Sequence, residues 1–192
     1  SFDLIYARPG QELKSWEKEL KHAISLGADH ISMYQLTIER QTPFYNMNKR
    51  GEFSMPDDEL AADIYDLTED LTSEAGYWSY EVSNYSKLGY ECRHNLIYWE
   101  GKEYIGIGPG AHGRLMTSFE PGTVDHMNVQ WIETRHHRSP DKWVENMSSS
   151  NFSSVESYSF ISTHDRAIEI LMTGLRLKQG ISFQSLDSAV GS

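Results

Sequence analysis

The first forty residues alternate between two apolar runs and one amphipathic segment, and this pattern restricts the fold more than any other feature. Residues 2–6 form a short apolar run, and residues 30–39 are β-branched and apolar, so both predict buried strands. Residues 13–26 between them have apolar side chains at a spacing near 3.6, and Gly27 follows as a helix-ending residue. A strand, a helix and a strand joined by short loops are typical of a βαβ unit with parallel strands.

The same periodicities predict the remaining elements of the chain. Further helices are expected at residues 56–74, 139–147 and 163–177. Further strands are expected at residues 78–82, 104–107, 114–119 and 124–133, the last three separated by turns that contain glycine and proline. Two parallel strands cannot form a stable sheet alone, so the first part of the chain is expected to need further partners.

The expected fold class is α/β, and we divide the chain into three parts. Residues 1–147 are expected to form the C-terminal part of an α/β domain with an antiparallel extension. Residues 148–162 are rich in serine and poor in aliphatic side chains, which predicts a linker, and residues 163–192 would begin a helical C-terminal domain. The chain starts directly within a predicted strand and without Met, so we expect it to be a piece of a longer protein.

Composition excludes several classes of function. The formal net charge of −11 argues against a general nucleic-acid-binding surface, which needs a basic face. No apolar run has the length of a membrane span, and no signal peptide is found. The single cysteine, Cys92, excludes an internal disulfide framework and is typical of a reducing compartment. We therefore expect a cytoplasmic protein without an integral membrane segment.

Residues 89–113 are the most distinctive stretch, because glycine, tyrosine and histidine are concentrated there. Four glycines stand at positions 106, 108, 110 and 113. Such density indicates that a ligand or another backbone approaches closely, since glycine leaves room beside the main chain. His94 and His112 lie in the same stretch. This block is therefore where we expect the functional site.

The residue types in this block leave several chemical interpretations open. Cys92 and His94 would point to the same side of a strand, and His112 could add a third metal ligand, but a structural zinc site needs four such ligands at recognisable spacing. His94 and Tyr98 are also chemically able to be axial ligands of haem iron. A hydrogen-bonded structural role for His94 is the alternative.

Two carboxylates and one hydroxyl are candidates in the predicted parallel strands. Asp3 and Glu39 lie in or at the end of a strand, where α/β folds place ligand contacts. The alternative for each carboxylate is a structural role at the strand edge. Thr37 could face either side of its strand.

Five segments spread over nearly the whole chain have a distinctive pattern: DLIYARPGQ, DHISMYQLTIERQTPF, GYWSYEVSNYSKLGYECRHNLIYW, YIGIGPGAHG and RAIEILMTGLRLKQGI. Together they resemble the oxygen-independent coproporphyrinogen III oxidase family of radical S-adenosylmethionine (SAM) proteins. More closely, they resemble its haem-chaperone branch, HemW. The resemblance implies a radical SAM partial (β/α) barrel, of which this chain would be the C-terminal part, followed by a small helical domain.

The resemblance also implies cofactors and their contacts. In the family, three cysteines spaced Cys-x-x-x-Cys-x-x-Cys hold a [4Fe–4S] cluster; that motif is absent here, and Cys92 is not one of the three. The family's SAM contacts would correspond to Asp3, to Thr37, and to the glycine-rich loop at or beside Ala111 and His112. The chain departs from the family at positions 7 and 8, where Ala-Arg replaces the usual Gly-Leu.

The haem-chaperone branch has the pattern HNxxYW, matched here by His94, Asn95, Tyr98 and Trp99. The resemblance implies haem binding, with His94 as the iron ligand and Tyr98 as a second ligand or a contact of a haem propionate. It implies a chaperone that delivers haem to an acceptor protein. The alternative is an enzyme that decarboxylates coproporphyrinogen III to protoporphyrinogen IX. Without the cluster cysteines, the chain itself is expected to be inactive.

Overall fold

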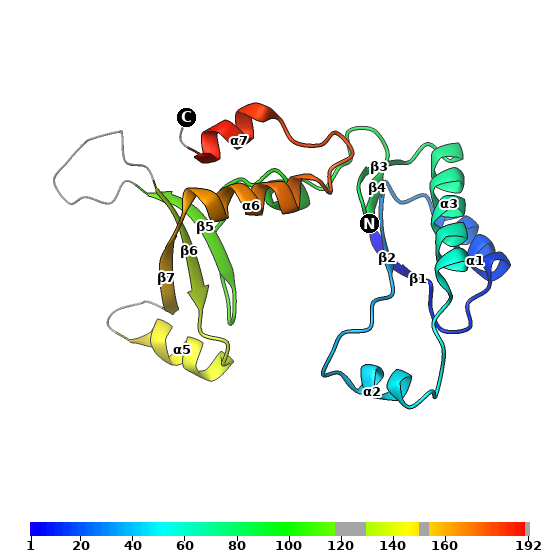
Figure 1. Cartoon of the computed structure of the whole chain (residues 1–192), viewed down its shortest axis with the longest axis horizontal. Helices are drawn as coiled ribbons and strands as arrows, with labels where there is room; N and C mark the ends of the chain where they lie inside the picture. Colours follow the sequence, from blue (N-terminus) through cyan, green and yellow to red (C-terminus); the bar gives the residue numbers. More distant parts are fainter. Residues whose placement is uncertain (118–129, 150–153, 191–192) are drawn as a thin grey trace. The chain divides into compact units, whose positions relative to one another are not determined.

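The computed structural model describes residues 1–117, 130–149 and 154–190, with side chains described as far as residue 187 (Figure 1). The chain divides into two compact units, residues 1–92 and residues 93–192, and each is described by itself. The sequence placed the main boundary after residue 147. No helix among the residues described is long and apolar enough to cross a membrane.

A four-stranded mixed sheet forms the centre of the first unit. Its strands lie in the order β1-β2-β4-β3. The first two are parallel and the other two are added antiparallel: β1 (Phe2–Tyr6), β2 (His30–Gln35), β4 (Asn84–Ser86) and β3 (Trp78–Glu81). Helix α1 (Leu13–Ser25) connects the parallel pair, so the predicted βαβ unit is confirmed. Strand β2 ends at Gln35, four residues before the expected end.

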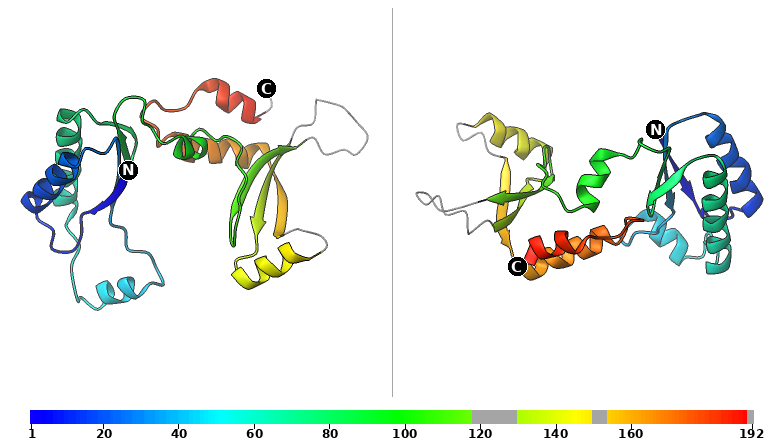
Figure 2. Two further views of the ribbon diagram at one scale, coloured as in Figure 1. Left: turned by 180° about the vertical axis from the view of Figure 1, so that it is seen from behind. Right: turned by 90° about the horizontal axis from the view of Figure 1, so that it is seen from above.

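Helices α1 and α3 (Asp58–Glu74) lie on one side of this sheet in all three views (Figures 1 and 2). Helix α3 starts where Asp57 caps it, because the Asp57 side chain accepts a hydrogen bond of 2.9 Å from the Leu60 amide. Gly76 follows the helix with φ of +77°, a conformation that glycine adopts without strain. A short helix that the sequence did not indicate, α2 (Pro43–Lys49), lies between β2 and α3.

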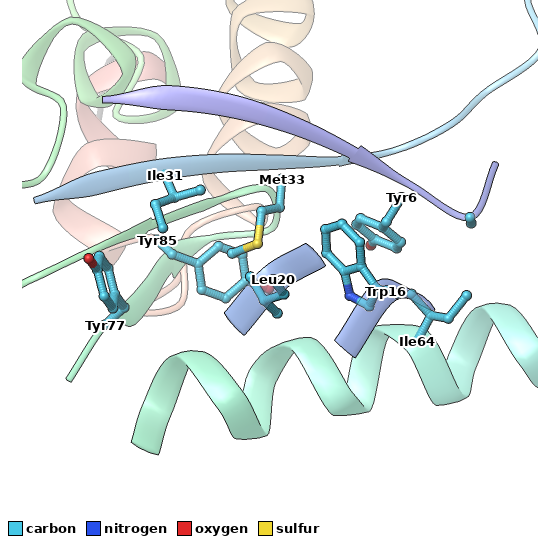
Figure 3. Close-up of a cluster of buried hydrophobic side chains, with 9 residues drawn as sticks. Tyr6, Trp16, Leu20, Ile31, Met33, Ile64, Tyr77 and Tyr85 are labelled. Carbon is cyan, nitrogen blue, oxygen red and sulfur yellow. The ribbon is translucent and has the colours of Figure 1, made fainter. Parts of the chain in front are cut away.

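The core of the first unit lies between the sheet and these two helices. Figure 3 shows Trp16 and Leu20 of α1 packed against Ile31 and Met33 of β2, all at most 1% exposed. Full burial of each such side chain stabilises the fold by roughly 1.5–3 kcal/mol. The Trp16 indole N–H donates a 2.8 Å hydrogen bond to Thr68 Oγ1, so the buried polar atom is satisfied.

A three-stranded antiparallel sheet forms the centre of the second unit, in the order β5-β6-β7. The strands are β5 (His112–Thr117), β6 (Gln130–His136) and β7 (Val155–Ile161). The helices are α4 (Arg93–Trp99), α5 (Pro140–Ser148), α6 (Thr163–Gly174) and α7 (Phe183–Val190). Helix α7 runs beside α6 (Figure 2). The predicted antiparallel extension and the helices after it are therefore parts of one unit.

Three details of the second unit differ from the sequence predictions. The stretch 148–162, expected as a linker, contains strand β7, because residues Val155–Ile161 pair antiparallel with β6 and include the strand-forming Val, Tyr and Phe. Residues 104–107 form only an isolated bridge from Tyr104 to Arg114 instead of a strand. Helix α6 ends at Gly174, three residues early. The predicted strand segments 118–119 and 124–129, and linker residues 150–153, lie outside the described residues.

Candidate functional site

The HNLIYW sequence forms helix α4, which sets the positions of its polar side chains. Cys92 directly precedes the helix, so the expected strand geometry for Cys92 and His94 is wrong. His94 and Tyr98 are four residues apart and therefore lie on one face of the helix. Tyr98 Oη is 3.2 Å from His94 Nε2, and the two rings meet edge to face with centroids 5.0 Å apart. Asn95 is half-buried, whereas the His94 side chain is exposed to solvent.

Tyr98 also contacts a second tyrosine that the sequence did not indicate. The Tyr104 ring packs edge to face on the Tyr98 ring with centroids 4.6 Å apart. The Tyr104 backbone is held by Arg114 through two hydrogen bonds of 2.8 and 2.9 Å. Burial raises the pKa of Tyr104, so its phenol stays protonated at neutral pH. The Tyr104 ring, whose backbone is fixed by Arg114, therefore packs against Tyr98 and supports the His94–Tyr98 pair.

Two arginines and one glutamate form an ionic network beside Tyr104. Glu169 Oε1 accepts from Arg114 Nη2 at 2.8 Å, and Glu169 Oε2 accepts from Arg166 Nη1 at 3.0 Å. The Arg166 guanidinium also stacks over the Trp131 ring at 3.6 Å. Burial alone would raise the pKa of Glu169, but the hydrogen bonds from Arg114 and Arg166 outweigh it and hold this pKa below its usual value.

The same network fixes the C-terminal end of α4. Arg166, which is 3% exposed, donates a hydrogen bond to the Gly101 carbonyl just after the helix. A Cβ added to Gly101 would lie 3.1 Å from Ile170 Cγ1 and 3.3 Å from Arg166 Nη2, and its φ is +63°. Glycine is therefore favoured there, because a positive φ strains other residues and a Cβ would crowd these two side chains. Arg176 stacks on Trp99 at 4.6 Å, so a second cation lies near this helix end.

The glycine-rich loop brings two parts of the backbone together. A Cβ on Gly106 would lie 2.2 Å from the His112 carbonyl oxygen, and one on Gly113 would lie 2.6 Å from Thr134 Oγ1. Of the two explanations that the sequence left open, the structure shows the close approach of another backbone at Gly106, whereas at Gly113 the nearest atom belongs to a side chain. Ala111 lies in this loop, where its carbonyl accepts a 2.9 Å hydrogen bond from the His136 amide.

The candidate SAM contacts fall in different units. His112, the first residue of β5, is exposed, and Ala111 precedes it in the second unit. Asp3 and Thr37 are exposed residues of the first unit. Asp3 is the second residue of β1 and therefore lies away from the carboxyl end of the strand, where α/β folds place ligand contacts. Thr37 follows the end of β2 and donates to the Gln35 carbonyl at 3.4 Å. Glu39 is exposed beyond β2.

Ala7 and Arg8, which replace the Gly-Leu usual in the family, adopt a left-handed backbone conformation and form an ion pair, respectively. Ala7 has φ of +54° and is 2% exposed, a left-handed conformation that glycine adopts at lower cost. Arg8 forms two hydrogen bonds with Glu19, at 3.1 and 2.5 Å. A groove of about 480 Å³ is lined by both residues of this ion pair and by Asp3. The positive charge introduced by Arg8 is therefore paired at the edge of that groove.

Sequence reasoning missed Tyr104, Arg114, Arg166 and Glu169. The spacing of Arg166 and Glu169 within one helix could have indicated their ion pair. Nothing in the sequence indicated that Arg114, 55 residues before Glu169, would reach the same carboxylate. Among the residues described, no group of three His, Cys, Asp or Glu side chains could hold a metal ion, and Cys92, His94 and His112 are not brought together as one.

Comparisons of the sequence with known proteins identify relatives of this chain. No protein-family model matches it. It is 36% identical over 186 residues to "Radical S-adenosyl methionine domain-containing protein 1, mitochondrial" of Danio rerio, covering 96% of this chain and 40% of that protein. It is 32% identical to "Heme chaperone HemW" of Bacillus subtilis and 35% identical to that of Synechocystis, covering 95% and 98% of this chain. Its homologues are radical SAM domain proteins and HemW haem chaperones.

The radical SAM fold is shared as well. The structure matches coproporphyrinogen III oxidase (HemN) of Escherichia coli, a radical SAM enzyme, with a TM-score of 0.65, at 13% identity, over 97% of this chain and 42% of that one. The predicted α/β fold class is therefore confirmed. The chain spans about two fifths of the length of the radical SAM and HemW relatives that it matches. Cys92 is the single cysteine of this chain, so the chain does not itself contain the three thiolates of a radical SAM cluster.

Proposed function

We propose that this chain is part of a haem chaperone, which binds haem at helix α4 and delivers it to an acceptor protein. The exposed, hydrogen-bonded pair of His94 and Tyr98 is the observation that supports this most directly. We propose the His94 imidazole as the axial ligand of the haem iron, a role that imidazole takes in haem proteins. HemW relatives at 32–35% identity support the same assignment. In this proposal haem is the cargo of the protein and the substrate of the transfer.

The geometry of the pair means that haem binding would exchange one partner of His94, the Tyr98 hydroxyl, for another, the haem iron. His94 Nε2 lies 3.2 Å from the Tyr98 hydroxyl, and in the tautomer with the proton on Nδ1 the Nε2 lone pair accepts from that hydroxyl when no haem is bound. Iron needs the same lone pair, so Tyr98 must release His94 when the iron binds. Release of haem restores the hydrogen bond, which offsets part of the cost of giving up the iron. An exposed iron ligand such as His94, which has Tyr98 as an alternative hydrogen-bond partner, is suited to transferring haem to another protein.

Contacts from outside helix α4 hold the helix in place, so that only the His94 and Tyr98 side chains need to move when haem binds. Tyr104 packs against the Tyr98 ring, and Arg166 holds the Gly101 carbonyl after the helix. Asn95, on the adjacent part of the same helix, stays a predicted haem contact. Because α4 is short, these external contacts, more than its own hydrogen bonds, stabilise it. The ligand pair is thus presented by an anchored helix.

A coproporphyrinogen III oxidase activity of the longer protein is the alternative. The match to HemN shows a shared fold and does not by itself favour that activity. SAM contacts at Asp3, Thr37, Ala111 and His112 also stay proposals, as does a cytoplasmic location, since some relatives are named mitochondrial. An anaerobic assay of the longer protein with SAM, a reductant and coproporphyrinogen III separates the two. Formation of protoporphyrinogen IX would support the enzyme.

A haem titration of the full chain tests the ligand assignment. We expect His94→Ala to weaken ferric haem binding at least tenfold and to shift the Soret band of the bound form. His164→Ala is the matched control, because His164 is an exposed histidine at the start of α6 in the same unit. Unchanged affinity and spectrum in His94→Ala would contradict the assignment of the iron ligand.

A further inference from the structure

A cavity of about 210 Å³ lies directly beside the His94–Tyr98 pair, and we name it the Tyr98 cavity. It is lined by Tyr98, Gly101, Lys102, Tyr104, Arg114, Arg166, Glu169, Met172 and Thr173. Tyr98 belongs both to this lining and to the pair with His94, so a molecule bound at His94 would lie next to the cavity. The sequence resemblance and the relatives assign no role to most of these side chains.

Cationic side chains outnumber carboxylates within the lining itself. Three cationic side chains, Lys102, Arg114 and Arg166, face one carboxylate, that of Glu169. Glu169 contacts both arginines, so the two guanidinium groups share a single carboxylate within the lining. Glu133, which is outside the lining, lies 3.5 Å from Arg114. The buried Arg166 Nε has no hydrogen-bond partner.

The ion pair that Lys102 forms within the protein is weak. Lys102 pairs with Glu100, but the Lys102 side chain is 63% exposed, and such surface pairs contribute little stability. An incoming anion can therefore displace Glu100 at small cost. The Tyr104 phenol, whose pKa is raised by burial, remains protonated at neutral pH. The lining thus combines cations with a neutral aromatic wall, which is suited to an anionic group attached to an apolar body.

We propose that the Tyr98 cavity takes a carboxylate side chain of the bound porphyrin, an inference that rests on the proposed haem binding. Arg114 and Lys102 would pair with the carboxylate, while Tyr98 and Tyr104 would contact the apolar part of the side chain. Arg166 is too buried to be the main contact and holds the floor of the cavity through Glu169 and the Gly101 carbonyl. The cavity volume suits one side chain and excludes the macrocycle.

The test compares haem with haem dimethyl ester, in which both carboxylates are esterified. We expect the full chain to bind haem about tenfold more tightly than the ester, because a charge-assisted hydrogen bond is lost. Arg114→Gln should weaken haem binding about tenfold and Lys102→Gln about threefold, with ester binding changed less than twofold in both. Lys142→Gln on α5, an exposed lysine outside the lining, is the control and should alter neither affinity.

The outcomes separate this subsite from the iron ligand. Equal binding of haem and ester by the wild-type chain would overturn the proposal, and so would equal weakening of both by Arg114→Gln. Lys102→Gln keeps the test valid if Arg114→Gln does not fold, since Lys102 is largely exposed. Iron-free protoporphyrin IX and its dimethyl ester repeat the comparison without iron. If the chain binds protoporphyrin IX more tightly than its dimethyl ester, the carboxylate subsite is supported independently of iron. If His94→Ala at the same time leaves haem affinity unchanged, the subsite stands and the proposed iron ligand is wrong.

Discussion

Replacing Glu169 with glutamine removes the carboxylate that holds Arg114 and Arg166 together. Glu169 accepts hydrogen bonds of 2.8 and 3.1 Å from Arg114 and of 3.0 Å from Arg166, whose side chain is 4% exposed. A glutamine keeps one acceptor but turns an amide N–H toward guanidinium donors. Breaking a fully buried ion pair costs about 3–5 kcal/mol. Because Glu169 is 31% exposed, we expect Glu169→Gln to lower the free energy of unfolding by about 2–3 kcal/mol.

The pH dependence of this loss follows from the lowered pKa of Glu169. A carboxylate whose pKa is depressed in the folded state stabilises the fold above its unfolded pKa. That contribution is lost as the pH falls through the folded pKa. The difference between wild type and Glu169→Gln should therefore be constant near neutral pH. It should shrink below the ordinary glutamate pKa and vanish once the carboxyl group is protonated in both states.

Urea unfolding followed by circular dichroism, at a series of pH values, measures both effects. The second unit must be resolved from the first, because a chain of two units need not unfold in one step. Glu145→Gln on α5 is the matched control, since Glu145 is exposed, and it should change the free energy by less than about 0.5 kcal/mol. A loss below that level for Glu169→Gln, or a loss that persists at acid pH, would refute the argument.

Two further substitutions test the loop and the ligand pair. Gly113→Ala should destabilise the second unit by about 1–3 kcal/mol, because the new Cβ would lie 2.6 Å from Thr134 Oγ1; thermal unfolding measures it, and the double variant with Thr134→Ala should recover part of the loss. Tyr98→Phe removes the hydroxyl that engages His94, so haem affinity should rise about twofold to threefold in a spectroscopic titration; a large fall in affinity would instead make Tyr98 an iron ligand.

The βαβ part of the first unit followed closely from local sequence. The apolar spacing of Trp16 and Leu20 on α1 and the apolar run around Ile31 predicted the βαβ unit, because the helix has a clear period that ends at Gly27 and the strands are continuous apolar runs. Strand β7 could not be predicted in this way. Its serines dilute the apolar pattern, and only pairing with β6 stabilises it as a strand. Helix α4 was missed for a similar reason, since seven residues are too few to show a helical period.

Taken alone, the sequence determined the α/β class, the family resemblance and the block of residues 89–113 as the place to look for function. Its histidine, tyrosine and glycine residues are local properties of the chain, and local patterns report on propensity and chemical type. The tertiary structure decided what these residues do. It packed Tyr104 against Tyr98, brought Gly106 against the backbone of His112, and joined Arg114 to Glu169 across 55 positions. Contacts between distant residues depend on how the elements pack, and no local pattern encodes them.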